Sequence, residues 1–76
     1  MIALTILNPR DVVFEGDVES LFLPGDKGEF ELLPFHAPMV SLLKAGDIVI
    51  DWKTRISIKN GIAKILNDEC VVLLEE

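Results

Sequence analysis

Apolar and polar residues alternate with a period of two along most of this chain. In Arg55-Ile56-Ser57-Ile58-Lys59, an extended backbone would point both isoleucines to one side and the polar side chains to the other. The same pattern puts Ile48, Ile50 and Trp52 on one face of the preceding segment. Alternation of this kind, rich in β-branched residues, is typical of strands that are buried on one face only.

Similar runs along the chain predict further strands, and turn-forming residues separate them at short intervals. Asn60-Gly61 is the strongest hairpin signal, because both residues tolerate positive φ. Met39 to Lys44 is too short for a convincing helix, so a strand or an extended loop is favoured there. The pattern predicts an antiparallel β-sandwich or flattened barrel, with these further strands: Ile2–Leu7, Val12–Glu15, Val18–Leu23, Glu29–Leu33 and Cys70–Leu74.

A chain of 76 residues has room for a single domain, predicted here over residues 1–76. Half of the residues are apolar, which is enough for a core without metal or disulfide support. We expect Trp52 and the four phenylalanines to belong to that core. Cys70 is the only cysteine, so no internal disulfide is possible, and its apolar surroundings predict a buried, unreactive thiol.

The net charge of −6 argues against nucleic acid as a partner. The acids concentrate in the first half of the chain, which indicates either a solvated acidic face or a docking surface for a basic partner. Apolar runs are too short to span a bilayer and no secretory signal is visible, so we expect a cytoplasmic protein without membrane insertion. The clustered acids are Asp11, Glu15, Asp17, Glu19, Asp26, Glu29 and Glu31.

Catalytic chemistry finds little support in the sequence. His36 and Cys70 would have to form a thiol site, yet Cys70 lies in an apolar run and nothing links the two. One histidine and one cysteine do not supply a zinc site, and Gly25-Asp26-Lys27-Gly28 has the spacing of a turn, not of a phosphate-binding loop. We therefore predict no catalytic residue, no cofactor and no metal.

Several linked motifs in the middle of the chain closely resemble the epsilon subunit of bacterial F-type ATP synthase. They are Val12 to Ser20, Leu23-Pro24-Gly25, Gly28-Glu29-Phe30, Leu33-Pro34 and His36-Ala37-Pro38. The resemblance spans essentially the whole chain. It implies a β-sandwich of about ten short strands and a non-catalytic subunit of the central stalk, or rotor.

The resemblance also implies two partners, the gamma subunit and the polar loops of the membrane c-ring. The c-ring-facing loop would comprise Gly25, Asp26, Lys27, Gly28, Glu29, Phe30 and Glu31, and the gamma-facing region would contain His36 and Ser41. Gly25 and Gly28 allow a tight turn, which we expect to carry Asp26, Lys27 and Glu29 at its tip. Through these contacts the subunit would couple ion-driven rotation to ATP synthesis at the inner face of the cell membrane.

Members of this family usually continue into a C-terminal helical hairpin that acts as a brake and sometimes binds ATP. This sequence ends at Glu75-Glu76, so neither braking nor nucleotide binding is carried over. An alternative of a different class remains open, a free-standing β-sandwich module that binds a sugar or a peptide. A groove lined by aromatic side chains would favour that alternative.

Overall fold

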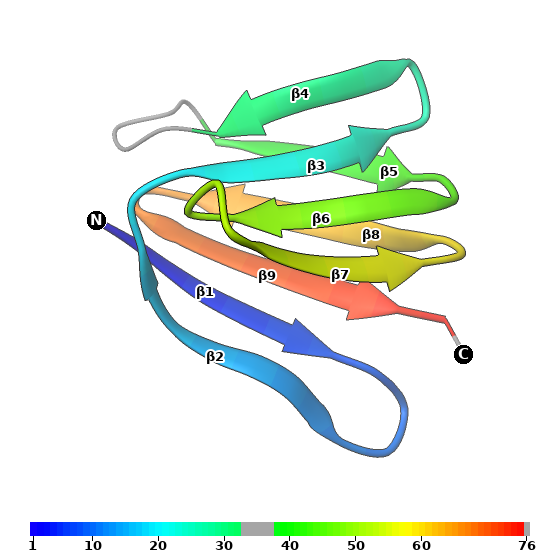
Figure 1. Ribbon diagram of the computed structural model, residues 1–76, viewed down its shortest axis with the longest axis horizontal. Helices are drawn as coiled ribbons and strands as arrows, with labels where there is room; N and C mark the ends of the chain where they lie inside the picture. Colours follow the sequence, from blue (N-terminus) through cyan, green and yellow to red (C-terminus); the bar gives the residue numbers. More distant parts are fainter. Residues whose placement is uncertain (33–37, 76) are drawn as a thin grey trace.

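The computed structural model describes residues 1–32 and 38–75, which form nine β-strands (Figure 1). The all-β prediction is confirmed, including a strand rather than a helical turn after Pro38. No helix in the described part of the chain has the length and apolar character needed to cross a membrane. The strands are β1 Ile2–Leu7, β2 Val12–Val18, β3 Leu21–Gly25, β4 Gly28–Leu32, β5 Met39–Leu43, β6 Gly46–Ile50, β7 Thr54–Ile58, β8 Gly61–Leu66 and β9 Glu69–Leu74.

The strands belong to one continuous sheet that curls over on itself. Their order is β2-β1-β9-β8-β5-β3-β6-β7, and β4 pairs with the other edge of β3. β5 and β3 share a single residue pair, Gly25 with Leu43, so the sheet turns sharply at this junction. The first layer therefore consists of β2-β1-β9-β8-β5 and the second of β4-β3-β6-β7 (Figure 1).

One strand pair departs from the expected antiparallel arrangement. β1 and β9 run parallel, with Ala3 opposite Glu69 and Leu7 opposite Leu73. These are the first and last strands of the chain, so no hairpin fixes their relative direction. All other recorded pairs among the described strands are antiparallel.

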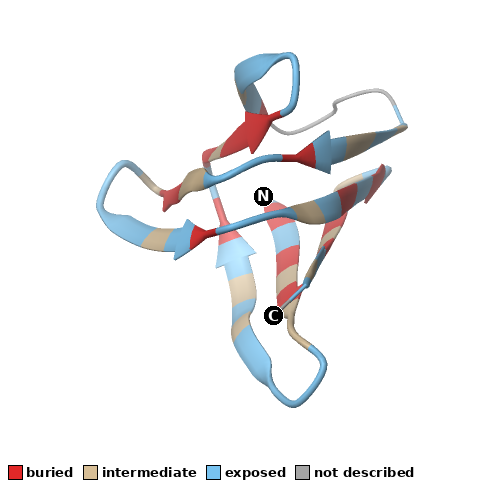
Figure 2. Cartoon of the chain, turned by 90° about the vertical axis from the view of Figure 1, so that its right-hand side faces the viewer, coloured by how far each residue is buried: buried red, intermediate tan, exposed pale blue. Residues whose placement is uncertain are grey.

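The core lies between the two layers and is built from one face of each strand. In β1, for example, Ile2, Leu4 and Ile6 are buried while Ala3 is exposed. Figure 2 shows this alternation as successive buried and exposed bands along the strands. Burying a side chain of this size contributes about 1.5–3 kcal/mol. The core comprises Ile2, Leu4, Ile6, Val18, Leu21, Leu23, Leu32, Leu43, Ile48, Ile50, Ile58, Ala63, Ile65, Cys70 and Val72.

Asn60-Gly61 does not form the predicted hairpin. β7 pairs with β6 in the second layer, whereas β8 pairs with β5 and β9 in the first. The segment therefore carries the chain from one layer to the other, and neither residue has positive φ. Gly61 is needed for a different reason, because a Cβ there would lie 2.7 Å from the carbonyl oxygen of Leu73.

Several strands also differ from the sequence pattern: β2 continues past Glu15 to Val18, and β8 over Gly61–Leu66 was not predicted as a strand. The predicted strand Val18–Leu23 is interrupted at Glu19-Ser20, where the chain passes from β2 to β3. The strand that was expected to reach Trp52 ends at Ile50. Trp52 lies in the following turn and is 64% exposed. The prediction that Trp52 belongs to the core is therefore wrong.

We expect Gly61→Ala to destabilise the fold by about 1–3 kcal/mol, because the added methyl group meets backbone and the strands must separate to admit it. Gly16→Ala is the matched control, since a Cβ there meets only the Phe14 ring at an ordinary 3.6 Å. Urea unfolding of both variants measures the difference. Equal midpoints would contradict the close approach of β8 and β9 at Gly61.

Candidate functional site

The predicted c-ring-facing loop folds as a β-hairpin with a two-residue turn. β3 ends at Gly25 and β4 begins at Gly28, and these two residues pair with each other. Asp26 and Lys27 alone form the tip. Gly28 has φ of 133°, and a Cβ on Gly25 would lie 2.8 Å from the Gly28 carbonyl oxygen, so both glycines are required by this geometry.

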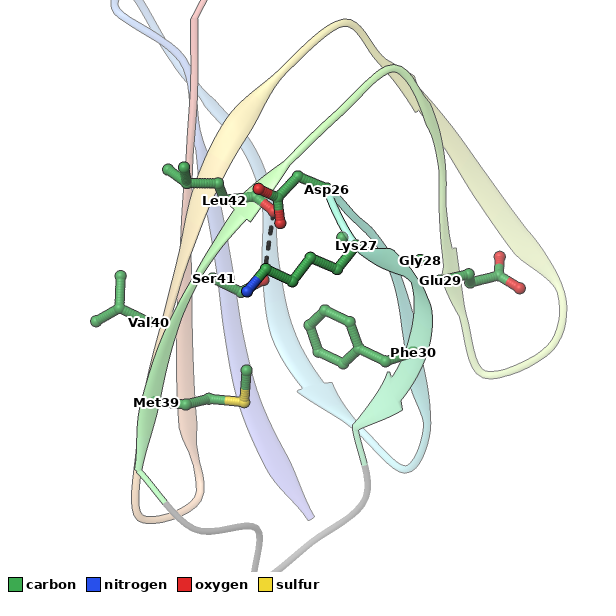
Figure 3. Close-up of a pocket in the computed structure, with 10 residues that line it drawn as sticks. Asp26, Lys27, Gly28, Glu29, Phe30, Met39, Val40, Ser41 and Leu42 are labelled. Carbon is green, nitrogen blue, oxygen red and sulfur yellow. Dashed lines mark hydrogen bonds between the residues drawn. The ribbon is translucent and has the colours of Figure 1, made fainter.

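Glu29 does not stand at the tip, which corrects the sequence-based expectation. It lies within β4 opposite Pro24, two residues beyond the turn. Glu29 is exposed to solvent. Figure 3 shows its side chain directed away from Phe30 and Ser41, toward the other side of the hairpin.

A hollow of about 610 Å³ separates the hairpin from β5. The Lys27 side chain lies across it toward β5, and the Phe30 ring and Met39 lie beside it (Figure 3). Two backbone hydrogen bonds tie the hairpin to β5 near the hollow, from Asp26 N to the Leu42 oxygen and from Lys44 N to the Pro24 oxygen, both 2.9 Å. The hairpin is therefore held in place at its tip as well as along its strands.

Of the two predicted gamma-facing residues, only Ser41 lies in the described part of the chain. His36 lies outside the described residues. Ser41 lines the same hollow as the hairpin, and its hydroxyl donates a long hydrogen bond of 3.3 Å to the Leu42 carbonyl oxygen. The structure thus brings Ser41 together with Asp26, Lys27 and Phe30; Glu29 also borders this hollow, but its side chain points away from Ser41 (Figure 3).

A polar cluster that the sequence pattern did not reveal joins three parts of the chain. The Asp51 carboxylate accepts hydrogen bonds from the backbone N–H groups of Glu19 (2.7 Å) and Ser20 (3.0 Å). Asp51 N donates in return to the Ser20 carbonyl oxygen at 2.9 Å. The buried Ser20 hydroxyl donates to the Glu31 carboxylate at 2.8 Å. We call Ser20, Glu31 and Asp51 the polar clamp, because they fasten the β6–β7 turn and β4 to the β2–β3 corner.

The outer face of the first layer carries a row of apolar side chains. Strand register aligns Leu42 with Ile62, Ile62 with Leu73, and Leu73 with Leu7 across β5, β8, β9 and β1. Leu42, Ile62 and Leu73 are between 42% and 55% exposed. The sequence analysis did not single out this row, because the register that aligns its members joins strands far apart in the chain.

Cys70 is buried in the core on β9. Burial raises the pKa of its thiol to about 11, so the nucleophilic thiolate is disfavoured. Within residues 1–32 and 38–75, no cluster of three histidine, cysteine or acidic side chains could hold a metal ion. Two exposed surface features stand out among the described residues: the acidic face of the hairpin and the apolar row.

The curled sheet and its single core define a small β-sandwich domain with exposed surfaces on both layers. Residues 1–76 match the family of the ATP synthase delta/epsilon chain β-sandwich domain. The chain belongs to this family, as the resemblance of its motifs indicated.

Individual relatives agree with this assignment. The chain is 45% identical to the ATP synthase epsilon chain of Campylobacter curvus and 40% identical to that of Nitratiruptor sp., and each match covers 95% of this chain and 59% of the relative. This chain thus spans about three fifths of the length of these relatives. A chain in the central stalk/c-ring structure of the Tetrahymena thermophila mitochondrial ATP synthase has the same fold, with a TM-score of 0.82, 9% identity, and coverage of 99% of this chain and 63% of that one.

We expect Asp51→Ala to destabilise the protein by about 1–3 kcal/mol, because the part-buried Ser20 N–H loses its acceptor. Asp51→Asn retains an acceptor oxygen and tolerates positive φ, so it should recover most of the loss. Asp47→Ala is the control, since its 3.4 Å ion pair with Arg55 is solvent-exposed and contributes about 0–1 kcal/mol. Thermal unfolding distinguishes them, and equal effects of Asp51→Ala and Asp47→Ala would refute the clamp.

The raised pKa of Cys70 predicts a pH dependence of stability. Because the folded thiol has the higher pKa, its stabilising contribution is complete below the unfolded value of about 9 and is lost as the pH rises toward 11. Wild-type protein should therefore lose more stability across this window than Cys70→Ala. The measurement is the free energy of unfolding in urea at several pH values. Parallel curves for the two proteins would show that the thiol does not titrate differently on folding.

Proposed function

We propose that this chain is the β-sandwich part of a non-catalytic central-stalk subunit of an F-type ATP synthase. It binds the gamma subunit and rests on the polar loops of the membrane c-ring. In this position it helps to couple ion-driven rotation to ATP synthesis, at the inner face of the bacterial cell membrane. It needs no cofactor for this role.

The match of residues 1–76 to the delta/epsilon β-sandwich family carries the proposal. Relatives that are 37–45% identical over most of the chain bear the name epsilon chain, and the structure with the same fold belongs to a central stalk and c-ring.

The β3–β4 hairpin is the part that we assign to the c-ring. Its residues from Gly25 to Glu31 present Asp26, Lys27 and Glu29 to solvent on a short, well-anchored element. Glu29 provides a carboxylate on the outer face of β4, where a basic side chain of a ring loop would form a charge-assisted contact.

The β5 side of the molecule is the part that we assign to gamma. The apolar row begins on this strand at Leu42 and continues over β8 and β9, whereas Ser41 alternates to the opposite face of β5, toward the hollow that it shares with the hairpin. Exposed apolar side chains in a continuous row are typical of a surface that a partner covers. The row lies on the first layer and Glu29 on the second, so the two partners would engage different faces.

A free-standing module that binds a sugar or a peptide is the alternative. Family membership over the whole chain weighs against it. The alternative called for aromatic side chains around a groove, and two of them, Phe22 and Trp52, do line a hollow on the second layer.

Glu29→Lys tests the ring contact. Replacing a weak attraction by repulsion should weaken c-ring binding and ion-driven ATP synthesis about 2- to 10-fold at low salt, with a smaller effect at high salt. Glu15→Lys is the control for the change in net charge, because Glu15 is an exposed acid on β2 in the other layer. Reconstituted vesicles report synthesis, and gel filtration reports binding to gamma.

Gamma binding should survive Glu29→Lys. If both substitutions leave synthesis unchanged, Glu29 is only a solvated acid. If Glu29→Lys abolishes gamma binding instead, the two faces have been assigned the wrong way round.

A further inference from the structure

The outer face of the second layer carries a row of side chains that runs from an acid to a base. Strand register aligns Glu31 with Phe22, Phe22 with Val49, and Val49 with Arg55 across β4, β3, β6 and β7. The two middle members are apolar and the two ends are charged. Glu29 lies next to this row, one outward position along β4 from Glu31.

Trp52 completes a hollow on this face. The hollow has a volume of about 230 Å³ and is lined by Phe22, Glu29, Val49, Trp52 and Arg55. Trp52 is 64% exposed. The apolar lining comes from Phe22, Val49 and Trp52, while Glu29 and Arg55 supply one charge of each sign.

The backbone at Trp52 is in a conformation that bulky residues rarely adopt. Asp51 and Trp52 have φ of 51° and 60°, and Lys53 N donates to the Ile50 carbonyl oxygen at 3.0 Å, as in a type I′ turn. Asparagine or glycine would suit this position better than tryptophan. The backbone conformation and the exposure of so large an aromatic residue are our reason to assign it a binding role, beside the buried Val49.

The turn is also held rigidly. Asp51, the residue before Trp52, is fastened to Glu19 and Ser20 by the three hydrogen bonds of the polar clamp. The same clamp holds Glu31 through the Ser20 hydroxyl. Trp52 and the acidic edge on β4 are thus fixed relative to each other before any partner arrives, which lowers the entropic cost of binding.

Size and charge indicate what the hollow receives. About 230 Å³ is below the usual 300–1,000 Å³ of small-molecule sites, so a side chain of a partner protein fits better than a free ligand. Arg55 has an acidic neighbour in Asp47 at 3.4 Å, whereas no ion pair is recorded for Glu29 among the described residues. The hollow carries one charge of each sign, and Glu29, for which no ion pair is recorded in the described part of the chain, favours a basic group beside the apolar contact.

We propose that the hollow beside Trp52 extends the c-ring contact at Glu29: a polar loop of the ring inserts an apolar side chain between Trp52 and Phe22 while a neighbouring basic residue of that loop reaches Glu29. The identity of the partner rests on the proposed function. Trp52 and Glu29 then act as one contact: the tryptophan supplies the apolar anchor and the carboxylate selects a basic loop.

The experiment is a titration of the full chain with the c-ring of the same organism in lipid nanodiscs. Trp52 is the only tryptophan and the chain has no tyrosine, so its emission reports on the hollow. Emission of the wild type, corrected with the same titration of Trp52→Asn, should shift to shorter wavelength. Trp52→Asn should bind the ring about tenfold more weakly, yet unfold at the same temperature as wild type or higher.

Leu66→Ala is the matched control, because Leu66 is 57% exposed on β8 in the other layer and should leave ring affinity unchanged. Glu29→Gln should reduce the affinity for the ring less in the Trp52→Asn variant than in the wild type, because both residues contact the same loop of the ring in this proposal. If wild type binds the ring but its emission and the affinity of Trp52→Asn do not change, this inference fails and the proposed function stands. If wild type does not bind the ring at all, the ring assignment in the proposed function fails as well.

Discussion

Closure of one aliphatic core between two layers is the constraint on which the rest of this structure depends. The chain has no disulfide, and no metal site occurs among the described residues, so stability comes from residues such as Leu4, Leu21, Ile48 and Val72 meeting across the layers. Each strand must keep one apolar face toward this core. Every other side chain is then directed outward and is free to serve a partner.

The polar clamp solves a second problem, the passage of the chain between layers. Ser20 is buried at the β2–β3 corner, where an unpaired N–H or hydroxyl would be costly. Asp51 and Glu31 provide acceptors for both groups, and in doing so they fix the β6–β7 turn and β4. A structural requirement of the corner therefore also fixes the edges of the hollow under Trp52.

The outward side chains form two surfaces of different character on the two layers. The first layer presents a mainly apolar row and the second presents an acidic edge beside a tryptophan. An apolar row gains most from permanent burial, whereas a mixed and charged surface suits a contact that depends on salt and on the partner's charge. The proposed assignments to gamma and to the c-ring follow this difference.

Prediction from sequence succeeded where local rules apply. Alternation identified the all-β class and strands such as Ile2–Leu7, and the glycines of Gly25-Asp26-Lys27-Gly28 identified a turn. It failed at Asn60-Gly61, because turn residues specify a local bend and not which strands pair afterwards. It failed at Trp52 because a period-two pattern does not state where a strand ends, and the clamp at Asp51 ends this one.

The sequence by itself determined the class of fold, the inward face of most strands, the buried state of Cys70 and the family, since each of these depends on local spacing or on linked motifs. Only the tertiary structure decided the parallel pairing of β1 with β9, the direction of Glu29 away from Ser41, and the alignment of outward residues into two rows. These features depend on strand register between segments far apart in the chain. Register is set by the closure of the whole core, and no short stretch of sequence encodes it.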